Sequence, residues 1–166
     1  MIGRIVRGLV ILIVVLAVAV GALFAAARLH DGPLGPIPGG PLQAGELVGQ
    51  PPADWGFATE VKQVEMQLAY EGDSRTTWIL VDNGAAYIPC NLDFPPGKRW
   101  YKAADADGAA IVRIGGKRYG VTLARVKDQA TIESLGKVAL AKYPEAARAR
   151  GGSVWFFKLE PRVAAG

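Results

Sequence analysis

The chain has 166 residues, 51% of them hydrophobic, and a formal net charge of +4. This length allows one domain plus a targeting or anchoring segment, and the hydrophobic content excludes a disordered protein. Three of the 19 basic residues (Arg4, Arg7 and Arg28) lie in the first thirty residues, which hold no acid. The remaining 16 basic side chains are nearly balanced by 15 acidic ones, and this near-neutral charge excludes an electrostatic footprint for DNA or RNA.

Cysteine and histidine are too scarce for several kinds of catalytic or metal site. Cys90 is the one cysteine and His30 the one histidine. An intrachain disulfide is therefore excluded, as are a Ser-His-Asp or Cys-His triad and a His/Cys zinc site in the folded domain. We expect no metal, and any catalysis would use Tyr, carboxylates, Lys or a cofactor. Individual catalytic residues cannot be assigned from the sequence.

Residues 8–27 form a run of twenty residues without a charge. A helix of this length crosses a hydrocarbon core about 30 Å thick. We therefore predict a single membrane span through residues 8–27. Arg4 and Arg7 precede the run, so the positive-inside rule places the N-terminus in the cytoplasm and the domain outside it, although Arg28 weakens this asymmetry.

The same segment has a second interpretation, a cleaved signal peptide. Ala25-Ala26-Ala27 offers the small residues that a signal peptidase needs. The apolar run is longer than is usual for a signal peptide, which favours an uncleaved anchor over residues 1–29. A buried helix of a soluble domain is the least favoured interpretation, because a domain of this size could hardly surround it.

Residues 30–45 are rich in proline and glycine, with prolines at 33, 36, 38 and 41. Such a composition cannot sustain a helix or a central strand. We predict a stiff linker here that holds the domain away from the membrane. The folded domain would then comprise residues 46–166.

The first part of this domain is patterned as β-strands. Apolar and polar side chains alternate through residues 64–70, which predicts a half-buried strand. Two apolar runs, 76–81 and 85–89, meet at Asp82-Asn83-Gly84. Asn-Gly is a strong hairpin signal, because both turn residues tolerate positive φ, so these runs should pair antiparallel.

The second part predicts another hairpin, a helix and a last strand. Gly115-Gly116 separates strands at 110–114 and 118–126. Apolar residues recur at helical spacing from 129 to 143, just before Pro144, and residues 154–159 return to a strand pattern. Five or six antiparallel strands with one or two helices indicate a mainly β (α+β) fold, a small split or closed barrel without exposed edges.

Residues 98–126 resemble the FMN-binding split-barrel superfamily, especially its deazaflavin-dependent nitroreductase-like branch. The matching residues follow in the family's order: Trp100-Tyr101, Ala106, Ile111 to Ile114, Gly115-Gly116, Arg118-Tyr119 and Ala124-Arg125. Residues 154–162 are similar to the closing strand of that superfamily. The Pro-Gly-Gly of the linker and Asp54 to Phe57 are similar to membrane-anchored bacterial relatives.

The resemblance implies an FMN or deazaflavin cofactor and a homodimer, since dimers are common in the superfamily. It also implies hydride transfer to a small organic substrate, with the chemistry supplied by the cofactor. Ala103 stands where the family carries Asn, and Gly108 where it carries Pro. The family's phosphate-binding turn has no clear copy, and Tyr70 to Thr77 is the nearest candidate.

The implied cofactor site combines cations with a flat apolar wall. Lys98 and Arg99 would meet the phosphate together with Arg75 and Thr76, and Trp100 would face the ring. Alternatively, Trp100 plugs the end of the barrel and the cations are solvated. A third interpretation is a weak contact of this patch with the membrane surface.

Cys90 ends a predicted strand about where the family often shows a Ser facing the cofactor. The alternative is a half-buried inert thiol. Two functions therefore stay open: a flavin- or deazaflavin-dependent oxidoreductase, and a non-catalytic ligand-binding or interaction module on the same barrel.

Overall fold

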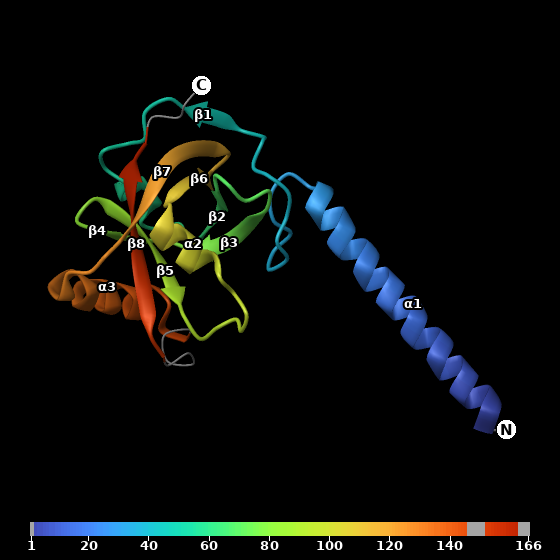
Figure 1. Ribbon diagram of the computed structural model, residues 1–166. Coiled ribbons are helices and arrows are strands. Elements are labelled where there is room, and N and C mark those ends of the chain that lie inside the picture. The colour runs from blue at the N-terminus through green and yellow to red at the C-terminus, as the bar shows by residue number, and fades with distance from the viewer. Residues whose placement is uncertain (1, 146–151, 163–166) are drawn as a thin grey trace.

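The computed structural model describes residues 2–145 and 152–162. In chain order, the elements are α1 (Ile2–Leu29), β1 (Glu46–Val48), the 3₁₀-helix η1 (Gly56–Ala58), β2 (Gln63–Leu68), β3 (Ser74–Trp78), β4 (Leu80–Asp82), β5 (Ala85–Asn91), α2 (Trp100–Ala106), β6 (Ala109–Ile114), β7 (Lys117–Arg125), α3 (Gln129–Lys142) and β8 (Val154–Pro161). Figure 1 shows the strands wrapped into one body, from which α1 extends alone.

The strands form one sheet in the order β3-β2-β6-β7-β8-β5-β4, with β1 added to β7. All pairs are antiparallel except β1 with β7. The strands at the two ends of this order, β3 and β4, are separated in the chain by Ile79 alone. The sheet therefore curls back on itself through one bent strand, and the predicted mainly β split barrel is confirmed.

The bend at Ile79 divides a segment that the sequence pattern predicts as one strand, 76–81. Where the strand bends, the Ile79 carbonyl accepts side-chain hydrogen bonds, from Lys142 Nζ at 3.0 Å and from Tyr143 Oη at 2.8 Å. Both donors belong to the end of α3, so this helix holds the bend. Since these partners lie more than sixty residues away, the bend could not be predicted from the local pattern.

Both predicted hairpins are confirmed. Asn83 and Gly84 have φ of 50° and 76° between β4 and β5, and Gly115 and Gly116 have φ of 57° and 78° between β6 and β7. Two successive residues at positive φ match the right-handed twist of paired strands. The predicted helix is α3, whose first turn is capped by Asp128, with the carboxylate accepting from the Thr131 N–H at 2.8 Å.

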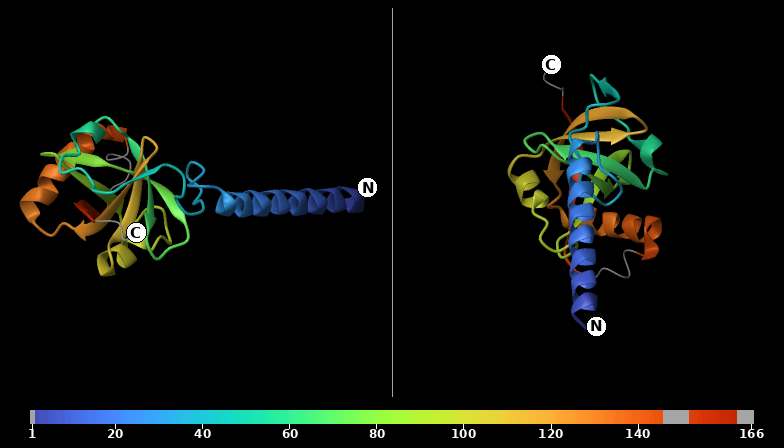
Figure 2. Two further views of the ribbon diagram at one scale, coloured as in Figure 1. Left: turned by 90° about the horizontal axis from the view of Figure 1, so that it is seen from above. Right: turned by 90° about the vertical axis from the view of Figure 1, so that its right-hand side faces the viewer.

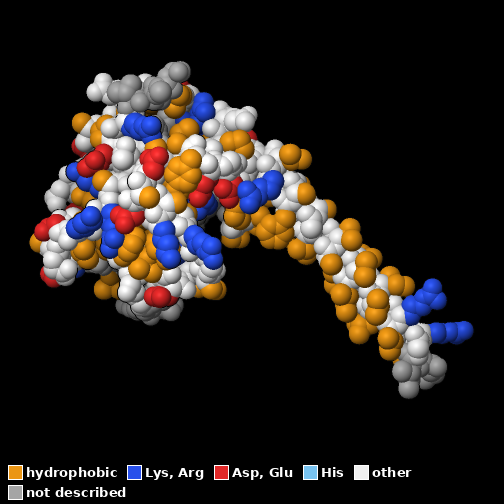
Figure 3. Space-filling model, viewed as in Figure 1, with side chains coloured by type: hydrophobic (Ala, Val, Ile, Leu, Met, Phe, Trp, Pro, Cys, Tyr) orange, Lys and Arg blue, Asp and Glu red, His pale blue; other side chains and the backbone are white. Residues whose placement is uncertain are grey.

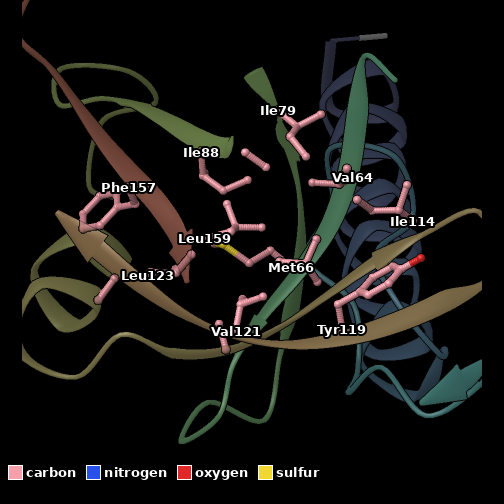
Figure 4. Packing of buried hydrophobic residues seen from close by; sticks show 14 of the residues in the cluster. Val64, Met66, Ile79, Ile88, Ile114, Tyr119, Val121, Leu123, Phe157 and Leu159 are labelled. Carbon is pink, nitrogen blue, oxygen red and sulfur yellow. The ribbon is translucent and has the colours of Figure 1, made fainter. Parts of the chain in front are cut away.

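The core lies between the strands. Figure 4 shows the side chains that meet there, from β2, β5, β6, β7 and β8: Val64, Met66, Ile88, Ile114, Tyr119, Val121, Leu123, Phe157 and Leu159. Helix α2 covers this cluster with Trp100 and Ala104, both buried. A second cluster lies beneath α3, where Leu135 packs with Leu80, Tyr87 and Phe156.

The Pro/Gly-rich linker contains no helix or strand longer than an isolated bridge, but it packs against the barrel. Gly39 bridges to Ser74, whose hydroxyl donates to Gly40 O at 2.6 Å. Leu42 is 2% exposed, and its N–H donates to the buried amide oxygen of Gln67 at 2.8 Å. The predicted division at 1–29, 30–45 and 46–166 stays a prediction. In the structure, the linker packs against the barrel through Gly39, Gly40 and Leu42.

Arg113 on β6 joins the start of the linker to the sheet. Its guanidinium contacts the carboxylates of Asp31, at 2.6 Å, and Glu65. Burial opposes ionisation of Asp31, but the N–H groups of Gln43 and Ala44 and the side chain of Arg113 lower its pKa to about 2. The linker is thus tied at both of its ends.

The C-terminal end of α1 is held by contacts with the linker and the barrel. Gly40 N donates to Ala27 O at 3.1 Å, and Arg28 pairs with Asp73 at 3.3 Å. Figure 2 shows α1 leaving from one side of the barrel and running away from it. The C-terminal end of α1 is therefore fixed beside the β2–β3 turn.

Helix α1 contains the predicted span 8–27, and Gly3–Leu29 is long and apolar enough to cross a membrane. None of its most apolar stretch is buried by the rest of the chain, and Figure 3 shows apolar side chains all along it. A signal sequence would have the same length and composition.

Candidate functional site

The structure brings two of the five predicted cofactor residues together. Arg75 on β3 lies opposite Met66 on β2, and directly paired residues point to the same face of a sheet. Met66 is fully buried, so Arg75 points toward the barrel interior. Its guanidinium carbon lies 5.8 Å from the centre of the Trp100 ring. The charges of Lys98 and Arg75 both act on the thiol of Cys90, so we call Arg75, Lys98 and Trp100 the Arg75 end of the barrel.

Arg75 is already paired with acids of the β2–β3 turn. It contacts Glu71 and, at 3.9 Å, Asp73. Burial raises the pKa of Glu71, Arg75 lowers it and Asp73 raises it. The Arg75 Nε is buried and has no hydrogen-bond partner within residues 2–145 and 152–162. The guanidinium therefore keeps one unsatisfied donor at the inner side of the barrel.

The other polar candidates are engaged by the backbone. Thr76 lies opposite Glu65, on the outer face, and donates to Gly35 O in the linker at 2.7 Å. Lys98 Nζ donates to the carbonyls of Asn91 and Phe94. Arg99 is exposed at the N-terminal end of α2. These side chains do not converge on one cavity.

Trp100 is part of the core. It is 9% exposed and lies against Phe157, with ring centres 5.6 Å apart and planes at 45°. An isoalloxazine or deazaflavin ring needs an open wall, and this ring offers none in the described conformation. Lys98 and Thr76 are bonded to carbonyls as well. The cofactor role predicted for these residues stays a prediction.

Cys90, at the end of β5, is buried at 2% exposure. Burial raises the pKa of its thiol to about 11, although the charges of Lys98 and Arg75 act in the opposite direction. A neutral buried thiol is a poor nucleophile. Among residues 2–145 and 152–162, no group of three His, Cys, Asp or Glu side chains could hold a metal ion.

An open groove lies elsewhere, between β1, η1 and the β6–β7 turn. It has a volume of about 610 Å³. Its lining residues are mostly apolar: Val48, Gln50, Pro52, Phe57, Val61, Ile114, Gly115, Lys117 and Tyr119. We call it the β1 groove. A mostly apolar hollow with a few polar groups is the usual form of a small-molecule site.

Three aromatic rings support the β1 groove. Tyr119 lies 5.3 Å from Trp55 and 6.1 Å from Phe57 between ring centres. Trp55 is buried, whereas Phe57 is 53% exposed. Tyr119 packs in the core cluster, but its hydroxyl points away from the centre of that cluster, as Figure 4 shows. Polar atoms near the groove therefore come from Tyr119, Lys117 and Gln50.

Sequence reasoning missed the β1 groove. Its one local signal is Phe57, an aromatic residue outside any predicted strand or helix. The wall itself depends on parallel pairing of β1 with β7, which sets Val48 beside Tyr119 across seventy residues of chain. No pattern within either segment predicts that pairing.

A second hollow, of about 460 Å³, lies between α3, β4 and the loop after η1. Glu60, Lys62 and Lys142 line it, so its charges are mixed. Burial lowers the pKa of Lys142, and burial raises that of Tyr143 to about 12. Lys142 and Tyr143 bond to Ile79 O, so we assign them to the barrel bend.

No protein-family model and no curated protein matches the chain. Several solved structures are similar in fold, and three of them follow. A protein described as a domain-swapped dimer is 20% identical, with a TM-score of 0.48, over 60% of this chain and 81% of that chain. A candidate pyridoxamine 5'-phosphate oxidase from Listeria innocua is 14% identical, with a TM-score of 0.45, over 60% and 82%.

The third structure is a candidate general stress protein 26 from Jannaschia sp. CCS1, 18% identical with a TM-score of 0.47, over 64% of this chain and 70% of that chain. Identities and TM-scores of this size say nothing about what this chain binds. None of the three descriptions names a deazaflavin-dependent nitroreductase, so that branch stays a prediction, as does the homodimer.

Proposed function

We propose that this protein is a single-pass membrane protein whose barrel, outside the cytoplasm, binds a small amphipathic molecule in the β1 groove without chemical conversion. The observation that carries the proposal is the groove itself, an apolar hollow of about 610 Å³ with few polar groups along it. A ligand with an apolar ring or chain and an acidic or carbonyl head group matches this lining.

The membrane part of the proposal rests on α1 and its flanks. The span is long enough, and Arg4 and Arg7 precede it. By the positive-inside rule, the barrel lies on the extracytoplasmic side. Protease protection of the full chain in sealed membranes tests this topology: protease added outside should digest the barrel. A barrel that is protected, or a chain that alkaline carbonate extracts, would contradict it.

The ligand part rests on the walls of the groove. Phe57 offers an exposed ring, and the half-buried Val48 and Val61 offer aliphatic surface. The Lys117 ammonium would attract an acidic head group, and the Tyr119 hydroxyl can donate a hydrogen bond to it. Both side chains come from β7, so one rigid strand would position the head group.

The competing hypothesis is the flavin- or deazaflavin-dependent oxidoreductase. One observation favours it, the buried Nε of Arg75 without a partner in the described chain, next to Trp100. An inward-facing donor of this kind could meet a ligand oxygen. Against it stand Lys98 and Thr76, whose donors are engaged by the backbone.

Titration of the full chain in lipid nanodiscs separates the two hypotheses. Anilinonaphthalene sulfonate, which joins aromatic rings to an acid, should bind. Phe57→Ala should lower the affinity for this probe about tenfold, because apolar contact is lost. Leu140→Ala is the matched control, since Leu140 on α3 is 49% exposed but lies outside the groove. Empty nanodiscs give the background.

The same preparation is titrated with FMN and with a deazaflavin. Binding of either, weakened by Arg75→Met and unaffected by Phe57→Ala, would favour the oxidoreductase. Lys117→Gln should weaken binding of the sulfonate but not binding of neutral phenylnaphthylamine, because only the sulfonate carries a charge. Equal probe binding by Phe57→Ala and the wild-type chain would refute the ligand proposal.

A further inference from the structure

The loop between β5 and α2, residues 92–99, holds a large apolar side chain in solvent. Phe94 at its tip is 47% exposed, and Pro95 and Pro96 beside it are exposed as well. This tip is a local concentration of apolar surface, separate from the β1 groove.

Hydrogen bonds give the loop a definite shape. The Asn91 side-chain oxygen accepts from the N–H groups of Asp93 and Phe94, at 2.9 and 2.8 Å. Lys98 Nζ closes the other side by donating to Asn91 O and Phe94 O. Phe94 is therefore presented outward by a constrained turn.

Cations lie next to this apolar tip. Arg99 and Lys102 are exposed on and before the first turn of α2, and Figure 3 shows basic side chains gathered over α2. Of the nearby acids, Asp105 pairs with Arg125 at 3.3 Å, whereas Asp93 accepts only a backbone hydrogen bond, from Ser153 N at 3.2 Å, and keeps its charge. The border of Phe94 thus carries Lys98, Arg99 and Lys102 against one carboxylate, Asp93.

The position of α1 relates this surface to the membrane. The linker contacts fix the end of α1 to the barrel, and Arg28 pairs with Asp73 beside the β2–β3 turn. In Figure 1, the β5–α2 loop hangs from the barrel on the side toward α1, whereas α3 lies on the opposite side. A bilayer around α1 would face this loop.

We infer that the β5–α2 loop and the first turn of α2 form a membrane-contact surface, in which Phe94 enters the lipid interface and Arg99 and Lys102 bind anionic head groups. Aromatic rings partition to the bilayer interface, and a basic residue beside an anionic leaflet strengthens binding about fivefold. The inference rests on the anchoring by α1 proposed above. It assigns the basic-aromatic segment to the lipid surface and not to a cofactor.

Site-specific labelling of the full chain tests this contact. Phe94→Cys and Leu140→Cys carry a polarity-sensitive fluorophore in vesicles of phosphatidylcholine with or without phosphatidylglycerol. Leu140, on α3, is 49% exposed and is the matched control. The wild-type chain, treated identically, reports labelling of buried Cys90. Lipid-borne nitroxide should quench the label at 94 several-fold more than the label at 140.

Charge and anchoring are tested separately. Arg99→Gln with Lys102→Gln should remove the extra quenching that phosphatidylglycerol causes. In the wild-type chain, amides 97–99 should exchange hydrogen more slowly on anionic vesicles. Equal quenching at 94 and 140 in a chain that resists carbonate extraction would overturn this inference alone. A chain that carbonate extracts would overturn the anchor, and this inference with it.

Discussion

The Arg75 end and the β1 groove use their side chains in opposite ways. At the Arg75 end, charged and aromatic groups turn toward the chain's own carboxylates, carbonyls and core. In the groove, ordinary residues such as Val48 and Val61 leave apolar surface open around Phe57. Residue types typical of a binding site can therefore serve the fold, and a hollow can arise from residues without any motif.

Burial is the physical cause of this difference. A cation that enters a barrel must be paired, because an isolated buried charge is costly. Arg75 accordingly meets Glu71, and Lys98 meets two carbonyls. Apolar side chains carry no such requirement, so a groove lined by them can stay open to a ligand.

Trp100→Ala gives the largest expected effect. Removing a buried ring from the core should lower the free energy of unfolding by about 3–5 kcal/mol. Urea denaturation of the full chain in nanodiscs measures this, with Trp100→Phe as the milder control. A loss below about 1 kcal/mol would mean that the Trp100 ring does not stabilise the core. The Arg75 end would then resemble the β1 groove, whose side chains leave apolar surface open.

Arg75→Met should cost about 1–3 kcal/mol, because Glu71 loses its partner. Burial already raises the pKa of Glu71, and loss of Arg75 raises it further. A carboxyl with a raised folded-state pKa favours folding below its ordinary value of 4.5 and loses that contribution as pH rises.

The deficit of Arg75→Met should therefore shrink as the pH falls toward about 4.5, because the raised folded-state pKa of Glu71 lies above this value in both chains. Denaturation curves at several pH values measure this. Glu71→Gln in the Arg75→Met background is the control, since a neutral amide should recover part of the stability and lose the pH dependence. A deficit that stays constant with pH would argue against a buried Glu71–Arg75 pair.

The neighbouring cations Lys98 and Arg99 should differ in how much they stabilise the fold. Lys98→Ala removes two hydrogen bonds and should destabilise the fold by about 1–2 kcal/mol, whereas Arg99→Ala should change stability by less than about 0.5 kcal/mol. Thermal unfolding of both variants compares them directly. Equal effects would remove the distinction between a structural Lys98 and a surface Arg99.

Phe57→Ala should also change stability by no more than about 0.5 kcal/mol, because the ring is 53% exposed. Its effect should lie in ligand affinity instead. The same denaturation assay, run beside the probe titration, shows whether the groove is a binding surface. A loss of several kcal/mol would make Phe57 part of the core.

Local chemistry explains which predictions are confirmed. Asn83-Gly84 and Gly115-Gly116 form the two hairpins because their backbone conformations suit the turns, and the spacing of Ile132 and Leu135 produces α3. The bend at Ile79 was missed, since its stabilising donors lie on α3. Of the candidate site residues, Arg75 and Trp100 do meet, but Thr76 faces outward, a consequence of register alone.

The sequence by itself determined the apolar helix, the alternating strands and the hairpin turns, because each depends on residues a few positions apart. Tertiary structure decided the rest. It paired β1 with β7 to open a groove, packed the linker onto the barrel through Arg113, and placed the β5–α2 loop on the side of α1. These features depend on contacts between distant segments, whose geometry follows only from how the whole sheet closes.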